Sequence, residues 1–400
     1  MDLKLSEQHE MQRSMTRDFV NKEIAPIAAD IDKSGEFPRD CLRKLAGLGT
    51  FGLLVPRPFG GTGPDKLGFF IANEEIAKAS ASISVSLIHS CLVSFFILAL
   101  GTDEQKKKYL SALAKGERLG AFCIAESGST ANWALTLQTT AQADGDGYVI
   151  NGSKSFISNG GEAEIYIVLA RTDPAKGPMG ISGLIVEKGT SGFSFGKRED
   201  KIGLRGDVTS ELIFENCRVP KANMLSESIA MPMGGIMTTL ALPSLGAAAV
   251  GVASAALDAA IEYVKQRTVI PGQTLANFDG VQSTIAEMAS KVEASRLLVY
   301  QAGLVEGQLP DPVPGLLASI YPCRAAIEVT GDALQLIGTL GYTKDFAVER
   351  YFRDAKGLTL VGQPIEMRKL MAGKLKLGLP PMGPLPGGPP PGGPGGHAQT

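Results

Sequence analysis

Histidine, cysteine and tryptophan are scarce in this chain of 400 residues, which has 3 histidines, 5 cysteines and 1 tryptophan. The cysteines lie far apart without a CxxC pair, so they suit neither a disulfide framework nor a zinc site, and we expect buried thiols. They are Cys41, Cys91, Cys123, Cys217 and Cys323. The histidines, His9, His89 and His397, are too dispersed for a metal cluster or a proton relay. The sequence therefore argues against metal-dependent and histidine-based catalysis.

An excess of charge of one sign is also missing, because 39 lysines and arginines face 41 aspartates and glutamates. Such a balance does not attract nucleic acid or an acidic membrane surface. The first residues, MDLKLSEQHE, lack a basic start followed by an apolar run, so we expect a cytoplasmic protein without a secretory signal. The apolar stretches Ser82 to Leu100 and Leu240 to Val264 contain polar or charged side chains, and we predict no membrane span.

The length indicates two or three domains, and the pattern of apolar residues changes twice along the chain. Residues 1–118 show helical spacing, and Thr102 with Gln105 has the spacing of a capping box. Residues 119–228 contain short β-branched segments bounded by glycine, aspartate and asparagine, which predict a small antiparallel β domain. Within it DGDG (144–147) predicts a hairpin turn. Helical patterns return over residues 229–378.

Residues 379–400 consist mostly of proline and glycine and lack apolar periodicity. Such a segment cannot bury enough surface to offset its ordering entropy, so we predict a disordered tail. Binding to a polyproline-reading partner is a less favoured alternative, because no aromatic or basic anchor residue stands beside it.

Four segments are similar to signatures of the acyl-CoA dehydrogenase superfamily, in the same order. They are GTDEQKKKYL, INGSKSFISNGG, KIGLRGDVTSELIFENCRVPKANML and QLIGTLGYTKDFAVERYFRDAK. The chain resembles this superfamily over about Leu5 to Lys376. The resemblance implies an α+β fold with an N-terminal helical domain, a central antiparallel β domain and a C-terminal four-helix bundle. It also implies FAD, extended between the β domain and the C-terminal helices, and an acyl thioester substrate.

The resemblance implies which residues contact the flavin end of FAD. Ser158 matches a hydroxyl that hydrogen-bonds near flavin N5, and Phe156 matches an aromatic side chain packed on the ring. Phe122 and Ile124, in AFCIAE, are expected to contact the cofactor as well. The simpler alternative is that Phe156 fills a strand and Ser158 belongs to a turn, but the flanking INGSKS and NGG also match the family.

Four further residues match positions that reach the diphosphate and adenine end of FAD from a neighbouring subunit: Arg267, Gln335, Gly338 and Gly341. A guanidinium suits a diphosphate geometrically, and glycines let backbone amides approach it closely. The alternatives are a helix-surface arginine and a pair of helix-stop glycines. If the match holds, the protein is a homo-oligomer, at least a dimer and by family a homotetramer, or a hetero-oligomer with a paralogue.

The carboxylate that removes the substrate's α proton in this family is missing from both of its usual positions. In most members it follows the RDAK signature, where this chain has Val361 or Gly362, and in a minority it lies at about Ala241. Glu366 and Asp279 are candidates for a relocated acid. For Glu366, which stands near other charged residues, a solvated helix face is the favoured alternative.

Two cofactor motifs are also altered. The family motif Thr-Glu-Pro-x-Ala/Gly-Gly-Ser-Asp corresponds here to AESGSTAN, so Ala125 lacks a hydroxyl and Ala131 and Asn132 lack a hydroxyl and a charge. Glu126 and Gly128 remain, and we interpret them as structural parts of the turn. The Arg-x-x-Phe-Gly stretch becomes RTVIPG. We expect these changes to weaken the affinity for FAD.

Three functions remain open. The first is α,β-dehydrogenation of an acyl thioester carried by coenzyme A or an acyl carrier protein, for example in bacterial specialised metabolism. The second is a flavin monooxygenase on the same fold, which needs no α-proton base. The third is a non-catalytic subunit paired with an active paralogue. A helical scaffold unrelated to flavin is disfavoured by the β-domain signatures.

Overall fold

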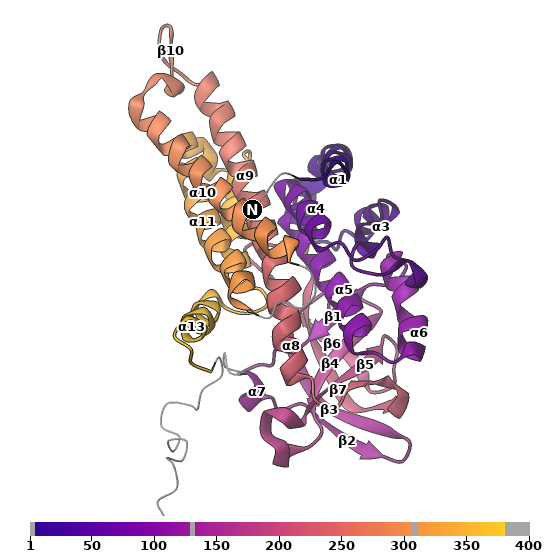
Figure 1. Ribbon diagram of the computed structural model, residues 1–400. Coiled ribbons are helices and arrows are strands. Elements are labelled where there is room, and N and C mark those ends of the chain that lie inside the picture. The colour runs from indigo at the N-terminus through magenta and orange to yellow at the C-terminus, as the bar shows by residue number, and fades with distance from the viewer. Residues whose placement is uncertain (1–4, 129–132, 306–310, 381–400) are drawn as a thin grey trace, which may run out of the picture.

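The computed structural model describes residues 5–128, 133–305 and 311–380. The tail predicted for residues 379–400 lies, from residue 381 on, outside the described residues, as do Ala131 and Asn132. Figure 1 shows a helical N-terminal part beside a sheet, with a long helical arm extending away from both.

The N-terminal helices include one long apolar helix that packs against two of the others. The helices are α1 (Glu7–Phe19), α2 (Ala28–Ser34), α3 (Arg39–Gly47), α4 (Lys66–Ala79), α5 (Ala81–Leu100) and α6 (Asp103–Ala114). At the start of α6 the Thr102 side chain accepts from the Gln105 backbone N–H, and the Gln105 side chain accepts from the Thr102 backbone N–H. The predicted capping box is confirmed.

The central sheet has the order β6-β7-β3-β2-β4-β5-β8, with β1 paired to β4. Its strands are β1 (Gly120–Cys123), β2 (Thr140–Asp144), β3 (Gly147–Ser158), β4 (Ile165–Arg171), β5 (Ile181–Glu187), β6 (Phe193–Arg198), β7 (Thr209–Pro220) and β8 (Met224–Ser226). The short helix α7 (Trp133–Thr136) precedes β2. Most pairs are antiparallel as predicted, whereas β1 joins β4 in parallel and Thr140 of β2 pairs with Arg171 of β4 in parallel. DGDG forms the β2–β3 hairpin, in which Gly145 has φ +60°.

The C-terminal helices form the arm. They are α8 (Ala230–Ile236), α9 (Leu242–Gln266), α10 (Asp279–Leu304), α11 (Val313–Ile337), α12 (Val348–Leu358) and α13 (Ile365–Lys376). A π-helical turn, η7 (Met237–Ala241), joins α8 to α9. The hairpin of β9 (Thr268–Ile270) and β10 (Gln273–Thr274) lies at the tip of the arm, at the opposite end of the molecule from the sheet (Figure 1).

Two stretches, Ala81–Leu100 and Pro232–Gln266, are long and apolar enough to cross a membrane by length and composition. Inside the protein 72% and 94% of their apolar windows are buried. They therefore have the surroundings of core helices. The five cysteines are free and buried, as predicted.

Serines spaced four residues apart on α5 attach this helix to the β domain. Ser82 Oγ accepts from the Gly206 N–H at 3.3 Å, and Ser90 Oγ accepts from the Gly120 N–H at 3.0 Å. Between them Ser86 Oγ donates to Asp207 Oδ1 at 3.2 Å. Residues at i and i+4 share one helix face. The hydrophobic helix thus presents a polar stripe to the loop before β7 and to the start of β1.

The RDAK segment on α12 connects all three parts of the chain. The Arg353 guanidinium forms an ion pair with Asp32 of α2, with NH2 2.6 Å from Oδ2, and NH1 donates to the Ile202 carbonyl at 2.6 Å. The next residue, Asp354, accepts from the Leu204 backbone N–H at 2.6 Å and is buried. Arg353 and Asp354 of this signature therefore connect α12 to the N-terminal helices and to the loop before β7.

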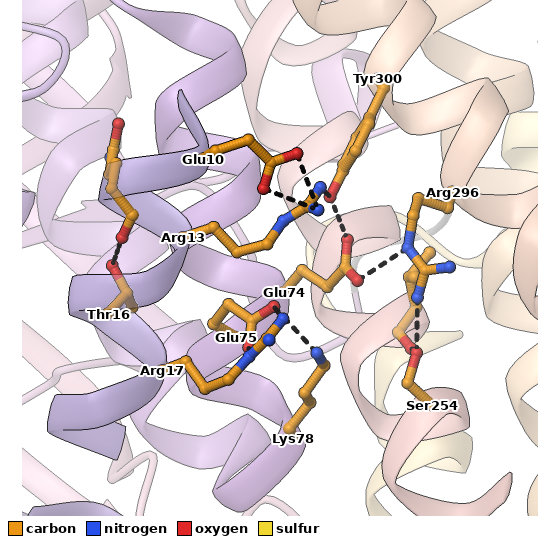
Figure 2. A network of polar contacts seen from close by, with 12 residues as sticks. Glu10, Arg13, Thr16, Arg17, Glu74, Glu75, Lys78, Ser254, Arg296 and Tyr300 are labelled. Carbon is orange, nitrogen blue, oxygen red and sulfur yellow. Dashed lines mark hydrogen bonds and ion pairs between the residues drawn. The ribbon is translucent and has the colours of Figure 1, made fainter. Parts of the chain in front are cut away.

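A second polar network joins the arm to the N-terminal helices (Figure 2). Glu74 of α4 is buried and accepts from the Tyr300 hydroxyl at 2.8 Å and from Arg296 Nε at 2.9 Å. Arg13 of α1 donates to the Tyr300 hydroxyl at 3.0 Å, and Arg296 donates to Ser254 Oγ of α9 at 3.0 Å. Buried polar groups need such partners, so this network determines how α1, α4, α9 and α10 fit together.

Candidate functional site

The end of β3 is the most strained segment of the sheet. The pairing of β3 with β7 shifts register between Lys154 and Ile157, which indicates a bulge. Phe156 has φ +56° and Asn159 has φ +60°. The left-handed region suits asparagine but is unfavourable for a bulky aromatic residue, and such strain clusters at functional sites.

The strain turns the Phe156 side chain outward, where it is 65% exposed. Two residues later Ser158 is buried, only 8% exposed, at the end of the same strand. An exposed aromatic ring held by an unfavourable backbone, next to a buried hydroxyl, offers an apolar surface and a polar atom to a flat ligand.

Ser158 hydrogen-bonds to a carboxylate that lies 49 residues further along the chain. Its Oγ donates to Asp207 Oδ2 at 2.8 Å, and Asp207 is 1% exposed. Lys201 Nζ lies 3.3 Å from the same Oδ2 and donates to Thr209 Oγ1 at 2.6 Å. Together with Ser86 of α5, these contacts surround the carboxylate of Asp207 with donors.

Asn159, next to Ser158, has hydrogen-bond partners for its side-chain nitrogen but, among the described residues, none for its side-chain oxygen. Its Nδ2 donates to the carbonyls of Ser86 and Gly120, both at 3.0 Å. Its Oδ1 is buried and has no hydrogen-bond partner among the described residues. A buried unpaired acceptor is costly in a native protein unless a ligand or water satisfies it.

The other residues predicted for the flavin end lie in the same domain. Phe122 of β1 is buried and stacks on Phe96 of α5, with ring centroids 4.5 Å apart and an interplanar angle of 12°. The Ile124 carbonyl lies 3.5 Å from Lys154 Nζ, on the strand that carries Phe156 and Ser158. Phe122 is therefore packed against α5 in the core, whereas Phe156 is exposed.

Glu126 has the structural role expected for the turn after β1. Its carboxylate accepts from the Gln138 and Thr139 backbone N–H groups at 2.6 and 3.0 Å and pairs with buried Lys154 at 2.7 Å. Burial raises the pKa of Glu126, but the charge of Lys154 and the hydrogen bonds outweigh burial, so its pKa lies below the ordinary value.

The residues predicted for the diphosphate and adenine end lie on the arm, apart from the β-domain group. Arg267 is exposed where α9 ends and the β9–β10 hairpin begins, at the tip of the arm (Figure 1). Gln335 is exposed in the last turn of α11, and Gly338 and Gly341 follow in a 3₁₀ turn. These four residues thus belong to the C-terminal helical domain, whereas Phe156 and Ser158 belong to the β domain.

The two positions that usually carry the family's catalytic carboxylate lie on segments that pack against each other. A side chain at Gly362 would start 3.5 Å from Leu245 Cδ1 and 3.9 Å from Met237 Cε. Ala241 lies one helical turn from each of those two residues and is 3% exposed. Val361 is half-buried beside Gly362. The meeting point is therefore lined by apolar side chains.

Models of the acyl-CoA dehydrogenase N-terminal, middle and C-terminal domains match residues 6–117, 121–217 and 236–374. The chain is 41% identical over 381 residues to the short-chain specific acyl-CoA dehydrogenase of Clostridium acetobutylicum, covering 94% of this chain and 100% of that protein. The chain belongs to the acyl-CoA dehydrogenase family.

Solved structures of family members agree with the fold. A prolyl acyl carrier protein oxidase has a TM-score of 0.89 and 27% identity, with 94% of this chain and 100% of that chain covered. A glutaryl-CoA dehydrogenase from Mycobacterium smegmatis, solved in complex with FADH2, has a TM-score of 0.87 and 26% identity, with 94% and 95% covered. The chain is thus an acyl-CoA dehydrogenase-like oxidoreductase with the helical, β and helical domains of this fold.

Within this family member, Glu366 does not lie at the meeting point of the two base positions. Its side chain is 74% exposed at the start of α13, and its carboxylate is 3.8 Å from Lys369 Nζ. This exposed position supports the interpretation that Glu366 belongs to a solvated helix face. Asp279 stands in the first turn of α10 and is also exposed.

Sequence reasoning missed two groups that shape this acyl-CoA dehydrogenase-like site. Asp207 was within the quoted segment KIGLRGDVTS, but nothing in that segment indicated contact with Ser158. Arg368 is fully buried and donates to the carbonyls of Gln363 at 2.7 Å and Val361 at 2.8 Å. No signal in the sequence indicated this burial, because Arg368 stands between Met367 and Lys369 and near Glu366, in a segment typical of an exposed charged face.

Proposed function

We propose that this chain binds FAD and dehydrogenates the α,β carbon–carbon bond of an acyl thioester carried by coenzyme A or an acyl carrier protein. The observation that carries the proposal is the strained backbone of Phe156, which holds an exposed ring beside Ser158. The unpaired Oδ1 of Asn159 nearby also fits a polar ligand. FAD, when bound, supplies the two-electron acceptor for this oxidation.

FAD would be held by residues of two subunits. Phe156 would pack on the flavin and Ser158 would hydrogen-bond to it, while Arg267 of a second copy would pair with the diphosphate. Arg267 directly follows α9, and the hairpin that begins there lies at the opposite end of the molecule from the sheet (Figure 1), which supports a contribution from a second subunit. The proposed assembly is accordingly a homo-oligomer, at least a dimer.

The apolar contact of Gly362 with the helix that contains Ala241 also favours a second candidate function. Dehydrogenation of a thioester needs a group that accepts the α proton, and neither position carries one. A flavin monooxygenase, or a non-catalytic subunit paired with an active paralogue, has no such need. Dehydrogenation would still be possible if the substrate or a partner supplied the group that accepts the α proton.

The deciding experiment compares the wild-type protein with Ala241→Glu and Ala241→Gln. Each protein is loaded with FAD and mixed without oxygen with saturated acyl-CoA and acyl-carrier-protein thioesters, and bleaching of the visible flavin spectrum is followed. Ala241 has helical backbone angles, so a longer side chain adds no backbone strain there. Gly362 has φ +74°, so it is the poorer place to install a carboxylate.

Bleaching of the wild-type protein would establish dehydrogenation with a proton acceptor outside the two usual positions. Bleaching by Ala241→Glu alone, at least about 100-fold faster than by Ala241→Gln, would show that the site binds the thioester and lacks only the base. If neither bleaches while FAD stays bound, simple dehydrogenation of these substrates is wrong. Oxygen-dependent product formation with supplied reduced flavin would then support the monooxygenase, and failure to bind FAD would support the non-catalytic subunit.

A further inference from the structure

We infer that Asp207 is a positioning residue that converts Ser158 from a hydrogen-bond donor into a hydrogen-bond acceptor toward the flavin, so that the site favours reduced FAD. This inference rests on the proposed binding of FAD next to Ser158. It concerns the direction of one hydrogen bond, which decides whether the oxidised or the reduced cofactor binds more tightly.

A serine hydroxyl has one proton to donate and two lone pairs that can accept, whereas a carboxylate can only accept. Ser158 Oγ lies 2.8 Å from Asp207 Oδ2, and the pair is buried. Hydrogen bonds to a charged acceptor are about twice as strong as neutral ones. The proton of Ser158 therefore stays on the side of Asp207, and the hydroxyl offers only lone pairs to a neighbouring ligand.

Several contacts hold the carboxylate of Asp207 in place. Ser86 Oγ donates to Asp207 Oδ1 at 3.2 Å, and Lys201 Nζ lies 3.3 Å from Oδ2. Lys201 Nζ also places a positive charge beside this buried carboxylate. Asp207 cannot turn away from Ser158 without breaking these contacts.

The N5 atom of oxidised flavin is a hydrogen-bond acceptor, whereas N5 of two-electron reduced flavin carries a proton and is a donor. An accepting Ser158 hydroxyl pairs with the reduced form and opposes the lone pair of the oxidised form. Loss of this hydroxyl should therefore weaken the binding of reduced FAD relative to oxidised FAD.

The test is the reduction potential of bound FAD in wild-type protein and in Ser158→Ala, measured by equilibration with a reference dye. We expect the ratio of the FAD Kd to the FADH2 Kd to fall about tenfold in Ser158→Ala, which for a two-electron couple is a potential about 30 mV more negative. Ser158→Thr, which keeps the hydroxyl, should retain the wild-type potential. Ser295→Ala is the matched control, because it removes a buried hydroxyl of α10 that bonds only to the Lys291 carbonyl of its own helix.

A more positive potential in Ser158→Ala would show that the hydroxyl donates to oxidised flavin, and would overturn the inference. An unchanged potential would overturn it as well, because Ser158 would then not contact N5. Repeating the Ser158→Ala change in an Asp207→Ala background should reverse the sign of its effect, since the hydroxyl proton is then free. A wild-type protein that binds no FAD would instead refute the proposed function itself.

Discussion

Asp354 should make the stability of this protein depend on pH in a direction opposite to that of most carboxylates. The side chain is buried, and burial raises its pKa to about 6 from 3.8, although the Leu204 N–H and the charge of Arg350 act in the other direction. When the pKa in the folded state is the higher one, the protonated group stabilises the fold. That stability is fully present below pH 3.8 and is lost as the pH rises through about 6.

The replacement Asp354→Asn removes this titration, and its amide oxygen can still accept from the Leu204 N–H. The difference in pKa corresponds to about 3 kcal/mol over the full titration, of which about 1.4 kcal/mol falls between pH 8 and pH 5. On lowering the pH from 8 to 5, the wild-type protein should therefore gain about 1.4 kcal/mol of unfolding free energy relative to the variant.

Urea denaturation of both proteins at several pH values measures this difference directly. Using the difference between the two proteins cancels the titration of every other group. Asp40→Asn changes a carboxylate whose side chain is 90% exposed, so it is the matched control, and its difference from wild type should stay constant. A constant difference for Asp354→Asn would refute the reasoning, and a difference of opposite sign would mean that the nearby arginines outweigh burial.

Two further predictions concern buried polar contacts. Glu74→Ala leaves Arg296 without its buried partner and should lower the unfolding free energy by about 3–5 kcal/mol. Glu293→Ala removes the exposed partner of the same arginine and should change it by less than about 0.5 kcal/mol, so equal effects in urea denaturation would contradict the role of the network. Arg368→Met leaves backbone carbonyls in the loop before α13 without donors and should lower the melting temperature, corresponding to about 2–4 kcal/mol. Lys369→Met, at the exposed neighbour, should be nearly neutral, and a neutral Arg368→Met would show that the loop keeps its shape without the guanidinium.

Residues close together in the sequence determined the local structure of this protein. The capping box of Thr102 and Gln105 and the DGDG hairpin depend on groups within a few residues, so their geometry follows from the pattern itself. The order of helical, β and helical segments follows from the period of apolar residues, which the sequence displays directly. The resemblance to acyl-CoA dehydrogenases predicted the family. It also showed that Ala241 and Gly362 occupy positions where family members carry a carboxylate.

Only the tertiary structure decided which distant residues meet. Ser158 and Asp207 are 49 positions apart, and Leu204 and Asp354 are 150 apart. No local spacing specifies such pairs, because they form when the loop before β7 packs between α5, β3 and α12. The parallel pairing of β1 with β4 was missed for the same reason. Residues adjacent in space but distant in sequence thus place a carboxylate against Ser158 and leave apolar side chains where the base was expected.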